Sequence, residues 1–267
     1  MAMQHAQPVG TLLREWRQRR RMSQLDLAGE AEISSRHLSF LETGRSRPSR
    51  EMLLHLAEQL EIPLRERNML LVAAGYAPMF AERSLDDPAL DAARKAIDLV
   101  LAGHQPYPAI AIDRHWTLVA ANDAAFGLLD GIDAALVQPP VNVLRLSLHP
   151  AGLAPRIVNL DEWRGHLFAR LRHEIDLTAD PRLVELLREL SSYPLPGNVQ
   201  ARHMPPTQDY AGVVVPLQLR TAAGVLTFFS TTMIFGTPLD VTLAELAIEA
   251  FFPADAATAS ALARTHS

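Results

Sequence analysis

Residues 23–48 constrain this chain most, because they carry the signals for two short helices joined by a tight turn. Ser23 is placed to cap the first helix, and Asp26 three residues later completes a capping-box pattern. The apolar positions inside this helix follow at helical spacing: Leu27, Ala28 and Ala31. Ile33 is then expected to fill the turn that leads into the second helix.

The second helix presents two different faces. Ser34 or Ser35 is placed to cap it, and Gly44 is expected to stop it. At about 100° per residue, Leu38 and Leu41 point to one side. The other side is polar and basic with one aromatic ring, and it consists of Arg36, Ser39, Phe40 and Thr43. Such a face suits the major groove of DNA, although a plain helical hairpin with a solvated face would show the same spacing.

The order of these residues resembles the Cro/repressor-type helix-turn-helix of the XRE family. The matching positions are Ser23, Gln24, Leu27, Ala28, Ala31, Ile33, Ser34, Leu38, Ser39, Leu41, Glu42 and Gly44. The resemblance covers about residues 9–75, and it departs at Glu32, where the family usually has glycine. If Glu32 adopts a left-handed conformation, the cost is roughly 1–2 kcal/mol.

The resemblance implies that this helix pair binds DNA. Gln24 would touch a phosphate group, Arg36 would read a guanine, and Phe40 would meet a thymine methyl group. In the loop that follows, Arg45 and Arg47 are placed to reach the sugar–phosphate backbone or a minor-groove edge. The DNA-binding residues that we expect are Gln24, Ser34, Ser35, Arg36, Ser39, Phe40, Thr43, Arg45 and Arg47.

Apolar periodicity predicts three further helices, over residues 9–22, 49–60 and 63–74. Residues 9–75 should therefore form an all-α domain of five helices. Residues 10–50 contain nine arginines and five acidic residues, whereas residues 84–267 contain 13 basic and 20 acidic residues. Because the whole chain has a formal net charge of −5, we expect phosphate contacts only at this basic N-terminal part.

The totals exclude several classes of protein. The 267 residues suggest two domains. The absence of cysteine excludes disulfides, Cys-ligated zinc and iron–sulfur clusters. No apolar run reaches 18 residues, and the N-terminus lacks the apolar core of a signal peptide. We therefore expect a cytoplasmic protein with no membrane partner.

The apolar period changes after Tyr107, beyond a linker and connecting helix over residues 76–103. Residues 108–112 and 116–121 read as strands on either side of a polar turn, and Asn122 is placed to cap a short helix. Strand, polar turn, strand, Asn and short helix is the opening of a PAS-type sensor domain.

Residues 104–255 are expected to form an α+β, PAS-like domain, in which an antiparallel sheet of about five strands holds a helical insertion. The further elements predicted are helices over 142–148, 161–177 and 181–193, a loop over 194–212, and strands over 213–219, 225–235 and 243–252. The last strand also scans as a helix, but the alternation of Leu246, Ile248 and Phe252 favours a strand. Residues 256–267 are predicted to be an Ala-rich tail, as a loosely attached helix.

The chain also resembles the MmyB-like regulators, in which a Cro/repressor-type domain precedes a PAS-like ligand-binding domain. The residues that carry this resemblance lie at 101–125, 142–159 and 228–255. It implies a sensor pocket for a fatty-acid-like ligand. An apolar cavity under a sheet would be lined by aromatic and aliphatic side chains, and an acyl carboxylate would need a buried cation or amide. The ligand-binding residues that we expect are Trp116, Asn122, Phe126, Leu144, Arg145, Leu148, His149 and Trp163.

No catalytic or metal-binding pattern is convincing. The sequence has no GxSxG, Walker A, GxGxxG or HExxH motif, and its ten histidines are scattered. We expect a non-enzymatic transcription regulator without a cofactor, apart from a bound acyl ligand, that binds a palindromic operator as a homodimer. The alternatives are a helix-turn-helix adaptor that binds proteins and no ligand, a haem or flavin sensor, and an enzyme that acts on a small acyl substrate.

Overall fold

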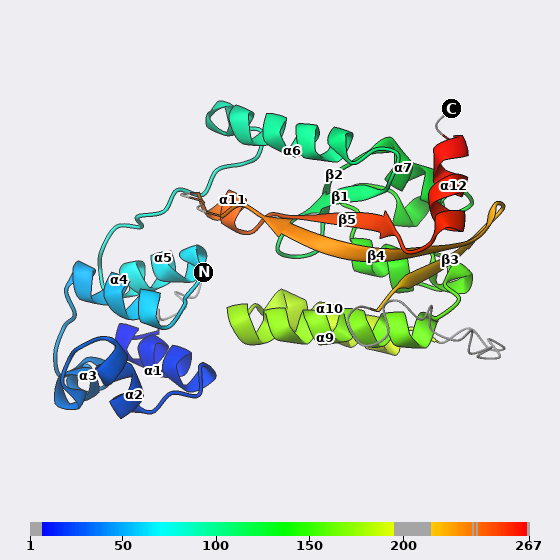
Figure 1. Cartoon of the computed structure of the whole chain (residues 1–267). Helices are drawn as coiled ribbons and strands as arrows, with labels where there is room; N and C mark the ends of the chain where they lie inside the picture. The colour runs from blue at the N-terminus through cyan, green and yellow to red at the C-terminus, as the bar shows by residue number, and fades with distance from the viewer. Residues whose placement is uncertain (1–6, 195–214, 237, 239, 266–267) are drawn as a thin grey trace. The chain divides into compact units, whose positions relative to one another are not determined.

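The computed structural model of the chain describes residues 7–194, 215–236, 238 and 240–265. These residues divide into two compact units, one of which contains the chain up to Arg83 and the other most of the chain from Ser84 onward. The first unit is all-α and the second is α+β, as predicted (Figure 1). The predicted loop over residues 194–212 and the start of the strand predicted at residue 213 lie outside the described residues, apart from residue 194.

The N-terminal unit consists of five helices around one apolar core. They are α1 (Val9–Arg19), α2 (Gln24–Glu30), α3 (Ser35–Glu42), α4 (Arg50–Gln59) and α5 (Leu64–Ala73). Each helix contributes fully or almost fully buried side chains, among them Leu13, Leu27, Leu38, Leu56 and Leu71. The periodicity of the sequence predicts these buried positions correctly because the leucines and alanines of the core recur at helical spacing.

All five helices end in the same way, with a residue in the left-handed conformation. These residues are Arg21, Glu32, Gly44, Glu61 and Gly75. At Glu32 the φ angle is +52°; its N–H donates to Gly29 O at 3.2 Å, and the N–H of Ile33 donates to Ala28 O at 2.9 Å. This pair of bonds is the Schellman motif, which satisfies the last carbonyl groups of α2. The turn therefore needs a left-handed residue whether or not that residue is glycine.

The second unit is built on a five-stranded antiparallel sheet with the strand order β2-β1-β5-β4-β3. The strands are β1 (Ala109–Ile112), β2 (Leu118–Ala121), β3 (Leu217–Thr221), β4 (Gly224–Ile234) and β5 (Ala247–Pro253). The last strand pairs with the first, with Ala109 opposite Ala250 and Ile112 opposite Ala247. The sheet thus brings the two ends of this unit together across about 140 residues of chain.

Helices cover both faces of this sheet (Figure 1). On one face, α6 (Asp91–Gly103) packs Ile97 and Leu101 against Ala109 and Ala111 of β1. The short helix η1 (Pro88–Leu90) leads directly into α6. The helices of the opposite side and the edges are α7 (Asp123–Phe126), η2 (Gly127–Leu129), η3 (Ala134–Leu136), α8 (Val143–Leu148), η4 (Ala154–Arg156), α9 (Leu160–Thr178) and α10 (Pro181–Ser192). The largest core cluster of the unit lies on this second face and joins α8, α9 and α10 to the sheet.

Two predicted strand boundaries and the predicted loose attachment of the C-terminal tail are wrong. The chain does not enter a strand at residue 243, because α11 (Val241–Ala244) comes first and β5 begins only at Ala247. Trp116 does not begin a strand either, since its φ angle of +63° places it in the turn before β2. The C-terminal tail is not loosely attached: α12 (Ala256–Thr265) buries Ala261 and Leu262 in the main core. Sequence periodicity does not detect these differences, because the Trp116 turn is set by hydrogen bonds to Asp113 and the attachment of α12 depends on a distant part of the core.

Replacing Glu32 by glycine should stabilise the N-terminal unit by about 1 kcal/mol, because glycine adopts a positive φ angle without steric cost. Hydrogen exchange of the α2 and α3 amides in the full chain measures this as roughly fivefold greater protection. Glu58→Gly, at an exposed position inside α4, is the matched control and should lower stability by a similar amount. Lower protection in the Glu32→Gly variant would contradict the strain that we assign to this residue.

Candidate functional site

The helix pair α2–α3 has the capping that the sequence predicts. The Ser23 hydroxyl accepts from the Asp26 N–H at 3.1 Å, and an oxygen of Asp26 accepts from the Ser23 N–H at 2.8 Å. Ser34 caps α3 by accepting from the His37 N–H at 3.1 Å. These caps set where each helix begins, and therefore which side chains α3 presents on its outer face.

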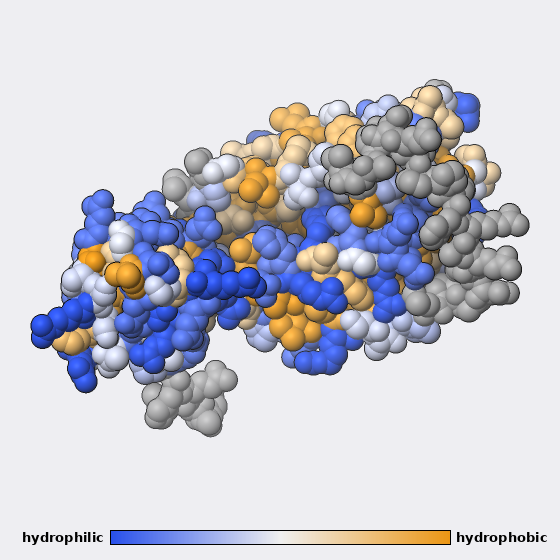
Figure 2. Space-filling model, turned by 60° about the horizontal axis from the view of Figure 1, so that its bottom comes forward, coloured by the Kyte–Doolittle hydropathy of each residue, from blue (hydrophilic) through white to orange (hydrophobic). Residues whose placement is uncertain are grey.

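The outer face of α3 combines cations with an aromatic ring. Leu38 and Leu41 are buried on the inner face. On the outer face, the guanidinium groups of Arg36 and Arg45 lie 5.3 and 5.9 Å from the centre of the Phe40 ring. Figure 2 shows that the viewed surface of the N-terminal unit is mainly hydrophilic. The face therefore offers positive charge for phosphate together with apolar contact for a base edge.

A buried carboxylate holds α1, α2 and α3 together. Glu42 has no exposed side-chain surface, and both its oxygens accept from Arg17, at 2.6 and 2.9 Å. It also accepts from Gln24 at 2.7 Å, and Arg14 lies 3.5 Å away. Burial by itself would raise the pKa of Glu42, but the hydrogen bonds from Arg17 and Gln24 outweigh it and lower that pKa. Glu42 therefore stays ionised and fixes the amide of Gln24 at the start of α2.

The predicted DNA-binding residues differ in how free their side chains are. Arg47 donates to Ala74 O at 2.6 Å, so it ties the loop after α3 to the end of α5. A side chain at Gly75, whose φ angle is +83°, would be strained and would displace this guanidinium. Thr43 donates to Ser39 O at 2.7 Å on the outer face of α3, and Ser35 beside them is half-buried. No local pattern predicts the contact between Arg47 and Ala74, because the two residues are 27 positions apart.

An apolar cavity lies between the sheet and the helices of its larger core. It encloses about 930 Å³ of space, including the part that opens to solvent. Of the predicted ligand-binding residues, Trp116, Phe126, Leu144 and Trp163 line it. Phe126 is 51% exposed, so it lies where the cavity opens, whereas the other three are buried. Leu148 is part of the same core but does not line the cavity.

The predicted polar ligand contacts are not in this cavity. Asn122 is buried and uses its side chain on four backbone groups, those of Leu101, Tyr107, Ala109 and Ala125. A residue that caps a helix and bridges two chain segments has no hydrogen-bonding capacity left for a ligand. The sequence predicts its capping role correctly and its ligand role incorrectly.

The predicted cations are also engaged elsewhere. Arg145 forms a two-bond ion pair with Glu189 of α10, with both distances at 2.7 Å. His149 accepts from the Ala151 N–H, and its ring packs edge-on against Tyr193. α8 thus turns these two side chains toward α10, while it turns Leu144 into the cavity.

The charged groups that do line the cavity come from α9 and the sheet. Arg170 of α9 pairs with Glu249 of β5 at 2.5 and 3.2 Å, and Thr232 of β4 donates to Glu249 at 2.8 Å. The guanidinium of Arg170 lies 4.8 Å from the centre of the Trp116 ring. The Trp116 N–H donates to Glu174 at 2.7 Å. Sequence reasoning missed this group because its members are spread over more than 130 positions.

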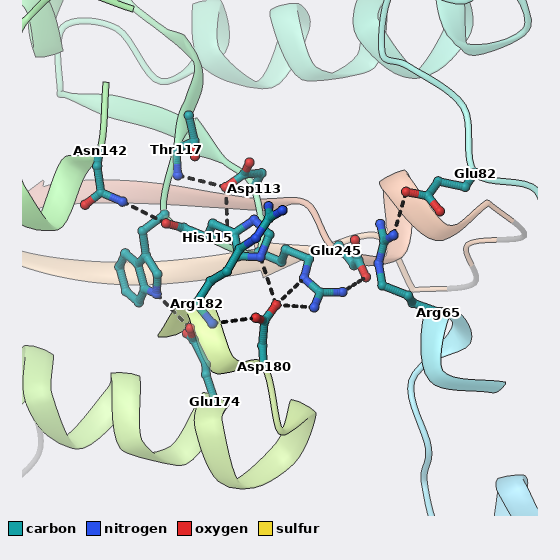
Figure 3. Close-up of polar contacts among 12 residues, drawn as sticks. Arg65, Glu82, Asp113, His115, Thr117, Asn142, Glu174, Asp180, Arg182 and Glu245 are labelled. Atoms are coloured by element: carbon teal, nitrogen blue, oxygen red, sulfur yellow. Dashed lines mark hydrogen bonds and ion pairs between the residues drawn. The ribbon is translucent and has the colours of Figure 1, made fainter. Parts of the chain in front are cut away.

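The turn before β2 is held by a second charged cluster, shown in Figure 3. Asp180 caps α10 and accepts from Arg114 and from His115, the latter at 2.8 Å. Arg114 also donates to Glu245 at 2.7 Å. Burial would raise the pKa of Asp180, but the hydrogen bonds from Arg114 and His115 outweigh it and lower that pKa from 3.8 to about 2. This cluster holds the left-handed turn that carries Trp116 into the cavity.

In the described part of the chain, no three histidine, aspartate or glutamate side chains are arranged to hold a metal ion. Among the described helices, none has the length and apolarity needed to cross a bilayer.

Two family models match this chain. One is described as the MmyB-like transcription regulator ligand binding domain and matches residues 93–264, which is more than half of the sequence. The other is described as helix-turn-helix and matches residues 13–67, which contain both α2 and α3. No curated protein matches the chain.

Replacing Asp180 by asparagine should destabilise the second unit by about 2 kcal/mol at neutral pH, because Arg114 and His115 lose their hydrogen bonds to this carboxylate and Arg114 keeps only Glu245 as a charged partner. The pKa of this carboxyl group is depressed in the folded chain. Its stabilisation is therefore complete above pH 3.8 and is lost as the pH falls through about 2. Urea denaturation at several pH values measures the difference between the two proteins.

Asp133→Asn is the control, since Asp133 is an exposed helix cap with a hydrogen bond to the Ala135 N–H. It should change stability by only a few tenths of a kcal/mol. A loss in Asp180→Asn that stayed the same from neutral to strongly acidic pH would show that its charge is not what stabilises the turn.

Proposed function

Because the chain belongs to the MmyB-like transcription regulators, we propose that it is a cytoplasmic, non-enzymatic regulator that binds a specific operator and whose PAS-like domain senses a fatty-acid-like ligand. It is a DNA-binding transcription regulator with a ligand-binding domain. The observation that carries the finer proposal is the apolar cavity between α8, α9 and the sheet.

The proposed DNA contacts come from α3 and the loop after it. Arg36 is exposed and has no acidic partner among the described contacts, and its position over Phe40 keeps it on the outer face of the helix. We assign base reading to this pair, with Ser35 and Ser39 beside them, and phosphate contact to Arg45. In a homodimer, two such helices would enter successive major grooves of a palindromic operator.

The proposed ligand is an acyl chain, because the cavity wall is almost entirely aliphatic and aromatic. Its position against Trp116 gives the ligand a contact with the turn that Arg114 and Asp180 hold. A ligand regulates DNA binding only if it has a different affinity for the two states of the protein. We propose that the turn before β2 differs between these states.

A second candidate function is a helix-turn-helix adaptor that binds another protein and no small molecule. The apolar cavity favours the sensor, because an adaptor does not need a hollow core. Mass spectrometry on small molecules released by denaturing the purified chain separates the two functions: acyl compounds support the sensor, and their absence from folded protein supports the adaptor.

Replacing Arg36 by alanine should weaken binding to an operator selected from random DNA by about 1–3 kcal/mol, and should relax the preference at one base pair. Arg45→Ala is the matched variant and should weaken binding to all DNA sequences equally, with a shallower dependence on salt. Fluorescence anisotropy with selected and scrambled DNA at several salt concentrations measures both effects. Equal loss on every sequence in Arg36→Ala would exclude base reading by this residue.

Replacing Ala125 by phenylalanine should fill the cavity from α7 and abolish the release of acyl compounds. Ala125 lines the cavity and is only half-buried, so the ring has room to adjust. Ala135→Phe, at an exposed position in η3, is the control and should release the same compounds as the unmodified chain. Equal release from both variants would place the ligand outside this cavity.

A further inference from the structure

The cavity wall carries one positive and one negative side chain among its described residues, and these two neutralise each other. They are Arg170 and Glu249, joined by two hydrogen bonds at 2.5 and 3.2 Å. The Glu249 side chain is 4% exposed and that of Arg170 is 24% exposed. In so little water, an ion pair with this geometry is held together strongly.

The pair leaves little capacity for a ligand carboxylate. Both oxygens of Glu249 are occupied by Arg170, and Thr232 adds a third hydrogen bond. A carboxylate that bound Arg170 would either share it with Glu249, at the cost of repulsion between two anions, or separate the pair. Separation would leave Glu249 as an uncompensated buried charge, which is strongly unfavourable.

A second carboxyl group lies near this ion pair. Glu174 lies one helical turn after Arg170 and accepts from the indole N–H of Trp116 at 2.7 Å. The pKa of Glu174 is raised, chiefly by burial and also by the charge of Glu249. The hydrogen bond from Trp116 and the charge of Arg170 act in the opposite direction. Behind the wall, the carboxyl group of Glu174 therefore lies near the same guanidinium group that Glu249 already neutralises.

The other polar groups in the wall are uncharged. The hydroxyl of Ser147 accepts from the Trp163 N–H at 3.0 Å, which leaves its own proton to donate. Ser230 is the remaining hydroxyl of the lining. The arginine of α8, Arg145, is bound to Glu189 outside the cavity. The described wall thus offers neutral hydrogen-bond donors for the polar end of a ligand.

We propose that the cavity selects acyl-chain ligands whose polar end is uncharged, such as a long-chain alcohol or ester, over the free carboxylate. This inference rests on the proposed acyl-ligand function and narrows its ligand class. Arg170 determines specificity through its ion pair with Glu249. Because its charge is already neutralised, it does not bind the carboxylate of a ligand.

The test compares 1-decanol with decanoate, which differ only at the polar end. Both are titrated into the full-length chain, freed of bound lipid, at about pH 8, where a carboxylic acid is ionised. Isothermal titration calorimetry gives both dissociation constants. We expect decanol to bind at least about tenfold more tightly, which corresponds to ~1.4 kcal/mol.

An ionised acid is also less apolar than an alcohol, so a variant has to separate the two causes. Glu249→Gln keeps the size of the side chain and leaves Arg170 with a neutral partner. In this variant decanoate should bind at least about tenfold more tightly than in the unmodified chain, while decanol binding stays the same. Glu189→Gln, which frees Arg145 outside the cavity, is the control and should change neither.

A double variant, Arg170→Gln with Glu249→Gln, removes both charges, keeps the wall neutral and should retain the preference for decanol. The double variant replaces Glu249→Gln as the test if that single variant does not fold. Tighter binding of decanoate to the unmodified chain would overturn the inference, as would an unchanged preference in Glu249→Gln or a lost preference in the double variant. If folded protein binds neither compound, the acyl-ligand function itself is wrong.

Discussion

A carboxylate that is removed from water has to be neutralised, and two such groups organise the two functional parts of this chain. In the N-terminal unit, Glu42 at the end of α3 collects hydrogen bonds from α1 and α2. In the other unit, Glu249 on β5 collects them from α9 and β4. Each pair joins elements that are far apart in the sequence, so each fixes tertiary geometry rather than a single helix or strand.

The same constraint explains which arginines are available for binding. Arg17 and Arg170 are each held by a buried carboxylate, and Arg145 is held by Glu189 at the surface. Arg36 is different, since its described contact is with the Phe40 ring and it remains exposed. An arginine that already has a carboxylate partner gives structure to the protein, and one without such a partner keeps its charge for a ligand. This distinction separates Arg36, the residue proposed to read bases, from Arg17, Arg145 and Arg170.

The cavity and the turn before β2 share one residue, Trp116. Trp116 lies in a left-handed turn, its indole ring lines the cavity, and its N–H bonds to Glu174. The flanking Arg114 and His115 bond to Asp180 at the start of α10. The turn that carries the ring is therefore connected through Arg114, His115 and Asp180 to the junction between α9 and α10.

The sequence by itself determined the elements whose signals are local. The caps at Ser23, Ser34, Asn122 and Asn142 begin helices where the sequence predicts, because a cap needs only the next three or four residues. Of the five apolar residues predicted to bind a ligand, Trp116, Phe126, Leu144 and Trp163 line the cavity, since apolar periodicity assigns them to the interior, whereas Leu148 packs elsewhere in the same core.

The tertiary structure alone decided what the polar side chains do. The helical start of the segment after residue 240, the turn at Trp116, the bond from Arg47 to Ala74 and the pair of Arg170 with Glu249 all depend on partners distant in sequence. A polar group seeks whichever partner the fold brings near, and a one-dimensional pattern does not contain that information.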